Sequence, residues 1–130
     1  MIVSVFVRRL KPGRTFEEFI AEWEADRGFG VPTRVVNAQS LDDPRDVLTI
    51  GFVDISVAEL EAGLARVAAQ EQARHDRIDT VIESTALRSM YELRAEHDFT
   101  SVPIAIEPGA AESLLAVLVT RERGRGEPRR

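Results

Sequence analysis

Residues 47–55 read VLTIGFVDI, and together with residues 2–10, IVSVFVRRL, they decide the fold. Both runs are rich in β-branched and aromatic residues, which favour strands. In residues 2–7 and 47–53, neither alternating set of side chains includes a charge. A strand that is uncharged on both sides belongs in the middle of a sheet, because edge strands usually carry charges that discourage further pairing. We therefore expect these two runs to be the central strands of one sheet.

Each of these strands is bordered by a helical pattern. A capping-box pair begins each pattern: Thr15 with Glu18, and Ser56 with Glu59. The first pattern places apolar residues on one stripe as far as Trp23 and stops before the Gly-Phe-Gly of residues 28–30. The second runs as far as Ile82, and a break within residues 70–75 would account for the sparse apolar residues there.

Two further strands complete the set and carry the charges. Residues 33–41 read TRVVNAQSL and residues 87–94 read LRSMYELR. The order strand, helix, strand, strand, helix, strand is the split βαβ motif, and right-handed crossovers place both helices on one face of the sheet. The sequence therefore predicts an α+β, ferredoxin-like βαββαβ sandwich with the antiparallel strand order 4-1-3-2.

The sheet face opposite the helices is the second consequence of this order. It is apolar in its centre, and an exposed patch of that kind usually marks an interface. Two such faces cover each other when two copies pack about a twofold axis. We therefore expect a homodimer of the dimeric α/β-barrel type, with each sheet covered by the partner.

The chain after residue 99 is expected to be an addition to this domain, residues 1–99. Residues 102–106, VPIAI, predict an edge strand because of Pro103. The C-terminal extension, residues 100–120, packs on the domain or on the dimer mate, and its part from residue 110 onward is compatible with either a helix or a strand. Residues 121–130 hold five Arg and two Glu and predict a frayed basic tail.

Composition limits the class of protein. The 130 residues suit one domain, and the absence of Cys excludes disulfides and thiolate-bound metals. The net charge of −5 argues against nucleic acid as a partner, because phosphate binding needs a basic face. We read no secretory signal and no apolar run of about 20 residues, which predicts a cytoplasmic protein without a membrane partner.

In this layout the chain resembles the dimeric α/β-barrel superfamily, and within it the antibiotic-biosynthesis-monooxygenase-like proteins. The resemblance lies in MIVSVFVRRLKPG, FEEFIAEW, the hairpin, the second helix and SMYEL, and it covers residues 1–96. It implies a dimer with a small-molecule cleft between helices and sheet in each subunit. Members of the family include cofactor-independent monooxygenases acting on polycyclic phenols, haem-degrading enzymes and muconolactone-isomerase-like enzymes.

The haem-degrading branch is disfavoured by particular residues. Its members use an Asn on the first strand with a Trp and a His on the second helix. Here the first strand has Ser4 and Phe6, and the one tryptophan, Trp23, is on the first helix. Only His75 has a counterpart, so the resemblance does not extend to haem degradation.

Two residues are candidates for catalysis. His75 falls on the apolar stripe of the second helix, where it can face the cleft as an acid, a base or a haem ligand, or bond a nearby carbonyl. Tyr91 can hydrogen-bond a phenolate or supply a proton. Because it alternates with Leu87 and Leu93, it is also expected to pack under a helix with its hydroxyl at the rim.

Four residues are candidates for substrate binding: Trp23, Phe19, Asn37 and Arg88. The two aromatic side chains belong to the core or line a pocket between helix and sheet. Arg88 can stabilise an enolate or a carboxylate by charge, or pair with Glu92 at the dimer seam. No metal site is expected, because His75-Asp76 and His97-Asp98 do not supply metal-ligand spacing. No cofactor is expected, because no phosphate loop or dinucleotide motif is present.

Two functions of different classes remain open. The first is a cofactor-independent monooxygenase or isomerase acting on a small aromatic or polyketide-like compound. The second is a non-catalytic binding or structural homodimer. A closed apolar pocket with His75 or Tyr91 at its wall favours the first, and a filled core favours the second.

Overall fold

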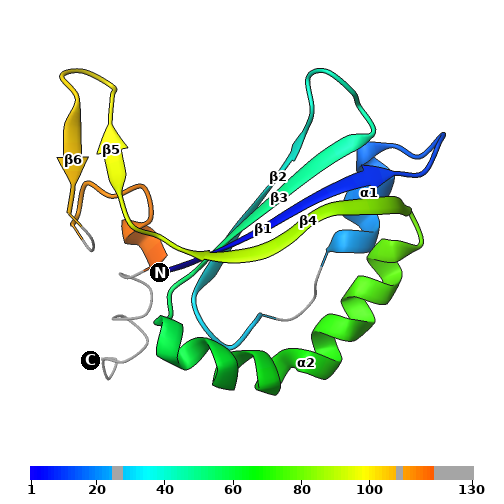
Figure 1. The fold of residues 1–130 in the computed structure, drawn as a ribbon, viewed down its shortest axis with the longest axis horizontal. Helices are drawn as coiled ribbons and strands as arrows, with labels where there is room; N and C mark the ends of the chain where they lie inside the picture. Colours follow the sequence, from blue (N-terminus) through cyan, green and yellow to red (C-terminus); the bar gives the residue numbers. More distant parts are fainter. Residues whose placement is uncertain (25–27, 108–109, 119–130) are drawn as a thin grey trace, which may run out of the picture.

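A four-stranded antiparallel sheet with both helices on one side forms the main body of the computed structural model (Figure 1), which describes residues 1–24, 28–107 and 110–118. The elements in chain order are β1 (Ile2–Leu10), α1 (Phe16–Trp23), β2 (Thr33–Gln39), β3 (Asp46–Val53), α2 (Val57–Asp79) and β4 (Ile82–Glu92). The strands lie in the order β2-β3-β1-β4. This is the predicted order 4-1-3-2 read from the other edge, so the ferredoxin-like fold and its two central strands are confirmed.

Helix α1 begins as its sequence predicts. The Thr15 side chain accepts a hydrogen bond from the Glu18 backbone N–H, and the Glu18 carboxylate accepts one from the Thr15 backbone N–H. At the other end, two side chains of α2 donate to the last carbonyls: Arg74 to Trp23 O at 2.8 Å and Arg77 to Glu24 O at 3.1 Å. The helix end is thus capped by α2, because carbonyls of the last turn lack partners within their own helix.

Helix α2 differs from the prediction in two ways. It is one continuous helix that curves beneath the sheet (Figure 1), so the expected break within residues 70–75 is wrong. Residues 64–79 contain neither Pro nor Gly, and the helix can therefore continue through its polar stretch. It also ends at Asp79, so Ile82 begins β4 rather than extending the helix, and β4 starts five residues before the predicted residue 87.

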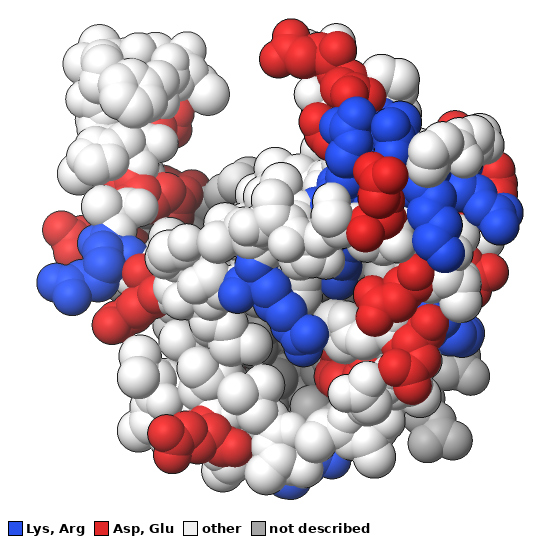
Figure 2. All heavy atoms as spheres, turned by 45° about the vertical axis from the view of Figure 1, so that its right-hand side comes forward, with Lys and Arg blue, Asp and Glu red and all other residues white. Residues whose placement is uncertain are grey.

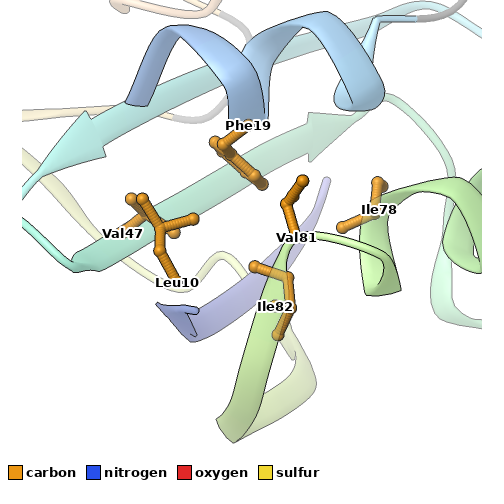
Figure 3. Close-up of a cluster of buried hydrophobic side chains, with 6 residues drawn as sticks. All are labelled: Leu10, Phe19, Val47, Ile78, Val81 and Ile82. Carbon is orange, nitrogen blue, oxygen red and sulfur yellow. The ribbon is translucent and has the colours of Figure 1, made fainter. Parts of the chain in front are cut away.

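The buried core occupies one end of the space between sheet and helices (Figure 3). Its six members come from both central strands, both helices, the turn before β4 and the first residue of β4: Leu10, Phe19, Val47, Ile78, Val81 and Ile82. Phe19 and Leu10 have no exposed surface. The core therefore fastens α1 and the C-terminal end of α2 to the sheet, and the rest of the space under α2 is left for the cavity described below.

The other face of the sheet, here called the open face, is covered by neither of the two helices (Figure 1). Pairing across β1 and β3 sets Val3 beside Phe52, Val5 beside Ile50 and Val7 beside Leu48. On the edge strands, Val36 is 52% exposed and Tyr91 is 49% exposed. The open face is therefore apolar at its centre, as the sequence predicts.

Beyond the main sheet, β5 (Glu96–Asp98) and β6 (Ile104–Ile106) form a separate hairpin that stands away from it (Figure 1). The expected strand at residues 102–106 is thus an edge of this small sheet and not of the main one. The Glu96 carboxylate accepts hydrogen bonds from Ser113 Oγ at 2.7 Å and the Leu114 backbone N–H at 2.8 Å. Residues 111–115 form turns and residues 116–118 are helical.

The hairpin presents apolar side chains to solvent. Phe99 is 72% exposed, Val102 is 77% exposed and Ile104 is 49% exposed, and Figure 2 shows the hairpin tip free of charged residues. The hairpin uses residues on both sides of the predicted boundary at residue 99, and the boundary itself stays a prediction. The expected end of the extension, residues 119–120, and the basic tail, residues 121–130, lie outside the described residues. Neither α1 nor α2 has the length and apolar character needed to cross a membrane.

Candidate functional site

A cavity of about 500 Å³ lies between the sheet and the helices. Its volume is in the range of pockets that hold small organic ligands. The helix-facing side chains of all four strands form its floor, and α2 forms its roof. The cavity has an apolar half and a polar half, which follow from the register of the strands.

The apolar half lies toward the start of β1. Here Ile2 is paired with Val53, and Ser4 is paired with Gly51. A Cβ atom at Gly51 would lie 2.6 Å from Ser4 Oγ. Glycine at this position therefore avoids a clash with Ser4 and leaves the cavity deeper at this point of the floor. The roof over this half comes from Ile55, Leu60 and Leu64. This half can therefore accept the hydrocarbon part of a ligand.

The polar half lies toward the other end of β1. Phe6, Arg8, Thr49 and Arg88 line the floor, and Glu71, Arg74 and His75 line the roof. The rings of Phe6 and His75 meet with centroids 5.6 Å apart. Periodicity explains the roof, because positions 71, 74, 75 and 78 recur at the helical spacing of three and four residues and so share one face of α2.

The groups of the roof hold one another in place. His75 Nε2 lies 3.6 Å from Glu71 Oε2, and Arg74 Nη1 donates to both carboxylate oxygens of Glu71 at 3.0 and 3.2 Å. The Arg74 guanidinium also lies 5.0 Å from the centre of the Trp23 ring. Burial acts to raise the pKa of the Glu71 carboxyl, but the proximity of His75 and the hydrogen bonds from Arg74 outweigh it and hold that pKa below its usual range.

This shift predicts a pH dependence of stability. The pKa of Glu71 is lower in the folded chain than the unfolded value of about 4.3, so the unfolded chain binds more protons as the pH falls. Its contribution to stability is present above that unfolded value and is lost as the pH falls through the folded pKa. We expect Glu71→Gln to lower the free energy of unfolding by about 1–2 kcal/mol at pH 7. The difference from the natural chain should be smaller at pH 3 than at pH 7.

Denaturant titrations at the two pH values measure this difference. The matched control is Glu61→Gln, which neutralises an exposed carboxylate on the same helix and should change stability by less than about 0.5 kcal/mol. A Glu71→Gln effect of equal size at both pH values would contradict the assignment of the effect to the charge.

Arg8 is the most deeply buried charge of the floor, with 3% of its surface exposed. Its Nη1 donates a long hydrogen bond of 3.4 Å to Thr49 Oγ1, and Thr49 in turn donates to Asn37 Oδ1 at 2.6 Å. The guanidinium carbon lies 4.2 Å from the centre of the Phe6 ring. Burial lowers the pKa of Arg8 to about 10. The floor therefore presents a cation that forms one long hydrogen bond and no ion pair with the described residues.

Arg8 also lies at an irregularity of the sheet. Val7 pairs with Leu87 and Arg8 pairs with Thr85, so Ala86 is an extra residue on β4. Such β-bulges increase the local twist and re-aim neighbouring side chains, and they are frequent next to binding sites. The bulge marks the edge of the polar half on the floor.

The predicted site residues fall in four places, of which the open face is described in the next paragraph. His75, Trp23 and Arg88 line the cavity. Asn37 lies on the helix side of β2 beside the floor, where it accepts a hydrogen bond from the Thr49 hydroxyl. Phe19 is fully buried in the core and does not line the cavity.

Tyr91 lies on the open face, so its expected place under a helix is wrong. It pairs with Val3, whereas Arg88 pairs with Phe6 and lines the cavity. The alternative place of Arg88, at a dimer seam with Glu92, is also wrong, because Glu92 pairs with Ile2 on the helix side. The more apolar set of β4 side chains was expected under the helices, but a partly polar cavity lies there.

Sequence reasoning missed three residues of the polar half: Arg8, Arg74 and Glu71. A signal for Arg8 was present, because strand alternation places it between Phe6 and Leu10 on the helix side of β1. His97 is exposed on β5, far along the chain from this group. Within residues 1–24, 28–107 and 110–118, no three His, Cys, Asp or Glu side chains are grouped so that they could hold a metal ion.

Comparison with known proteins adds one likeness. The chain is similar to the crystal structure of a proposed antibiotic biosynthesis monooxygenase from Chloroflexus aurantiacus J-10-fl, with 19% sequence identity and a TM-score of 0.49. The match covers 75% of this chain and 96% of that chain. No protein-family model matches the sequence, and a search of curated proteins gives no match. At this identity and TM-score the likeness carries no conclusion about activity, which has to be argued from the site.

Proposed function

We propose that this protein binds a small aromatic or polyketide-like molecule in the cavity and removes a proton from it, with His75 as the base. The observation that carries the proposal is the position of His75, which lines a cavity of about 500 Å³ with Glu71 Oε2 3.6 Å from its Nε2. An imidazole that accepts a proton becomes positively charged, and a neighbouring carboxylate stabilises that charge and orients the ring.

The product of this step is an anion. Loss of a proton from a phenol, or from a carbon beside a carbonyl, leaves negative charge on oxygen, and Arg88 lines the same cavity to stabilise it. Return of the proton to another carbon completes an isomerisation. In the cofactor-independent monooxygenase reaction, the substrate anion instead supplies electrons to O₂. One oxygen atom then enters the product and the other leaves as water.

Proton abstraction can be tested before the natural substrate is identified. Anthrone and a set of hydroquinones and 1,3-diketones are incubated with the protein in deuterated buffer. NMR follows exchange of the acidic C–H proton of anthrone and the diketones, and an oxygen electrode follows O₂ uptake with all of them. For any compound that reacts with the natural protein, we expect His75→Gln to lower the rate of exchange or O₂ uptake by roughly 10²–10⁴-fold, the usual contribution of a positioned base.

The chain provides its own matched control. His97 is the only other histidine and is exposed on β5, so His97→Gln should leave the rate unchanged. A His75→Gln protein that keeps the natural rate would overturn the assignment of the base. Binding without exchange or O₂ uptake in the natural protein would favour the non-catalytic alternative.

That alternative has one observation in its favour. Of the described residues that line the cavity, His75 is the only histidine, and no tyrosine, cysteine or aspartate joins it. Tyr91, the expected second proton-transfer group, lies on the open face. A protein that binds its ligand without changing it needs only the cavity.

We also propose that the protein is a homodimer in which the open faces of two copies cover each other. The uncharged centre of that face supports this, since exposed apolar patches of such extent are unusual on monomers. The exposed apolar side chains of the β5–β6 hairpin support the related proposal that the C-terminal extension packs on the dimer mate.

A further inference from the structure

We propose that the ligand of the cavity is an organic anion, a carboxylate carried on an apolar or aromatic body, and that Arg8 binds the carboxylate. The inference deepens the proposed function and rests on it, because it names the chemical class of the molecule that enters the same cavity. It requires no reaction, so binding alone can test it.

The wall of the cavity carries a positive formal charge. Three arginines line it, Arg8, Arg74 and Arg88, against one carboxylate, Glu71, which gives a formal charge of 3 − 1 = +2 without His75. The whole chain carries a net charge of −5. A positive cavity in a negatively charged protein is a local feature, and its field favours a negative ligand at that place.

Two of these three arginines have no carboxylate partner in the part of the chain that the structure describes. Glu71 already receives two hydrogen bonds from Arg74, and among the described residues no carboxylate forms an ion pair with Arg8 or Arg88. Asp79 is the acid whose charge acts most on Arg8, but the two groups form no ion pair. Arg74 adds a buried Nε atom without a hydrogen-bond partner.

Burial of the Arg8 guanidinium costs free energy of folding. The buried Arg8 guanidinium has one protein hydrogen bond, of 3.4 Å, and the face of the Phe6 ring, and neither contact supplies a negative charge. The neighbouring charges of Arg74 and Arg88 disfavour its protonated form further, and burial lowers its pKa to about 10. A bound carboxylate would supply the missing acceptors, because the planar guanidinium matches two carboxylate oxygens. Arg8 therefore stabilises the fold less than a hydrophobic residue would, and its presence is explained by a ligand.

The rest of the cavity indicates what the carboxylate is attached to. Beyond Phe6 the floor continues with Ser4 and Ile2, which face Gly51 and Val53. The low floor at Gly51 and the aliphatic roof leave room for a flat hydrocarbon body. Charge at one end and apolar surface at the other describe an aromatic or polyketide-like carboxylic acid.

Two probes of the same shape separate charge from hydrophobic binding. Calorimetric titration compares 2-naphthoate with 2-naphthalenemethanol, which replaces the carboxylate by a neutral hydroxymethyl group. We expect the natural protein to bind the carboxylate roughly ten- to a hundredfold more tightly. In Arg8→Met this preference should fall to less than threefold, while the affinity for the alcohol is kept. The same charge is removed from an exposed turn by Lys11→Met, which should leave the preference unchanged.

The folded state of the variants is measured at the same time. If Arg8 is retained for a ligand, Arg8→Met should melt at the same temperature as the natural protein or above it, since a hydrophobic side chain replaces a buried charge. Arg8→Lys keeps the charge without the planar fork and should retain part of the preference. If Arg8→Met does not fold, the preference for naphthoate measured in Arg8→Lys tests the proposal in its place.

Each outcome has a distinct meaning. Equal affinity of the natural protein for both probes would overturn the anion proposal and leave the small-molecule function standing. A preference for naphthoate that survives in Arg8→Met would remove Arg8 from the proposal. Failure of both probes to bind at millimolar concentration would overturn the anion site, whereas the proposed function is decided separately by the exchange and O₂ uptake of anthrone, the hydroquinones and the diketones.

Discussion

Replacing Phe19 with alanine should lower the free energy of unfolding by about 3–5 kcal/mol, the range found for large aromatic residues in a core. Phe19 has no exposed surface and lies among Leu10, Val47 and Ile78, where α1 meets the sheet. A loss of this size is a large part of the 5–15 kcal/mol that stabilises a typical domain.

The measurement is denaturant unfolding followed by the fluorescence of Trp23, the one tryptophan of the chain. Phe99→Ala is the matched control, because Phe99 is 72% exposed and its removal should change stability by less than about 0.5 kcal/mol. Equal losses in the free energy of unfolding for the two substitutions would show that packing of Phe19 between α1 and the sheet is not a main source of stability.

The second large effect is expected on assembly. A homodimer has a molar mass of 2 × 14.5 = 29.0 kDa, and Ile50→Lys should reduce the mass seen by light scattering to that of one chain, 14.5 kDa. Ile50 lies at the centre of the open face beside Val5, on the two central strands. A lysine there would have to bury an unpaired charge between two sheets, which costs far more than a dimer contact of this kind supplies.

Leu41→Lys provides the comparison for assembly. Leu41 is fully exposed in the loop after β2, so the same chemical change at that place should leave the mass at 29.0 kDa, twice the 14.5 kDa of one chain. A mass of 14.5 kDa for the natural protein would contradict the homodimer. The proposed ligand site would be unaffected, because the cavity lies between the sheet and the helices and not on the open face.

The sheet could be predicted because its strands obey one simple rule. Residues 2–7 and 47–53 are uncharged on both sides, and only an inner strand tolerates that. The helix starts were equally clear, since the hydroxyl of Thr15 and that of Ser56 each bond the backbone N–H three residues later. These signals are local, and they hold whatever the rest of the chain does.

The site was harder to predict because its chemistry depends on which side of a strand faces the helices. In β4 the apolar set holds Leu87 and Tyr91, and hydrophobicity alone places that set under α2. The opposite set, with Arg88, faces α2, because a partly polar cavity and not a filled core lies beneath the helix. Burial of Arg8 could not be read from its sequence neighbours, since Arg9 next to it is half-buried and pairs with Asp46.

The alternation of β1 also bears on how a protein of this kind can diversify. Ser4 and Phe6 face the cavity, whereas Val3 and Val5 face the other way, and the two sets share no side chain. Substitutions at the first set alter what the cavity accepts without reshaping the apolar face, and the effects of changes on separate surfaces are close to additive. The proposed ligand preference and the proposed self-association can therefore evolve as independent traits, although side chains of a single strand contribute to both.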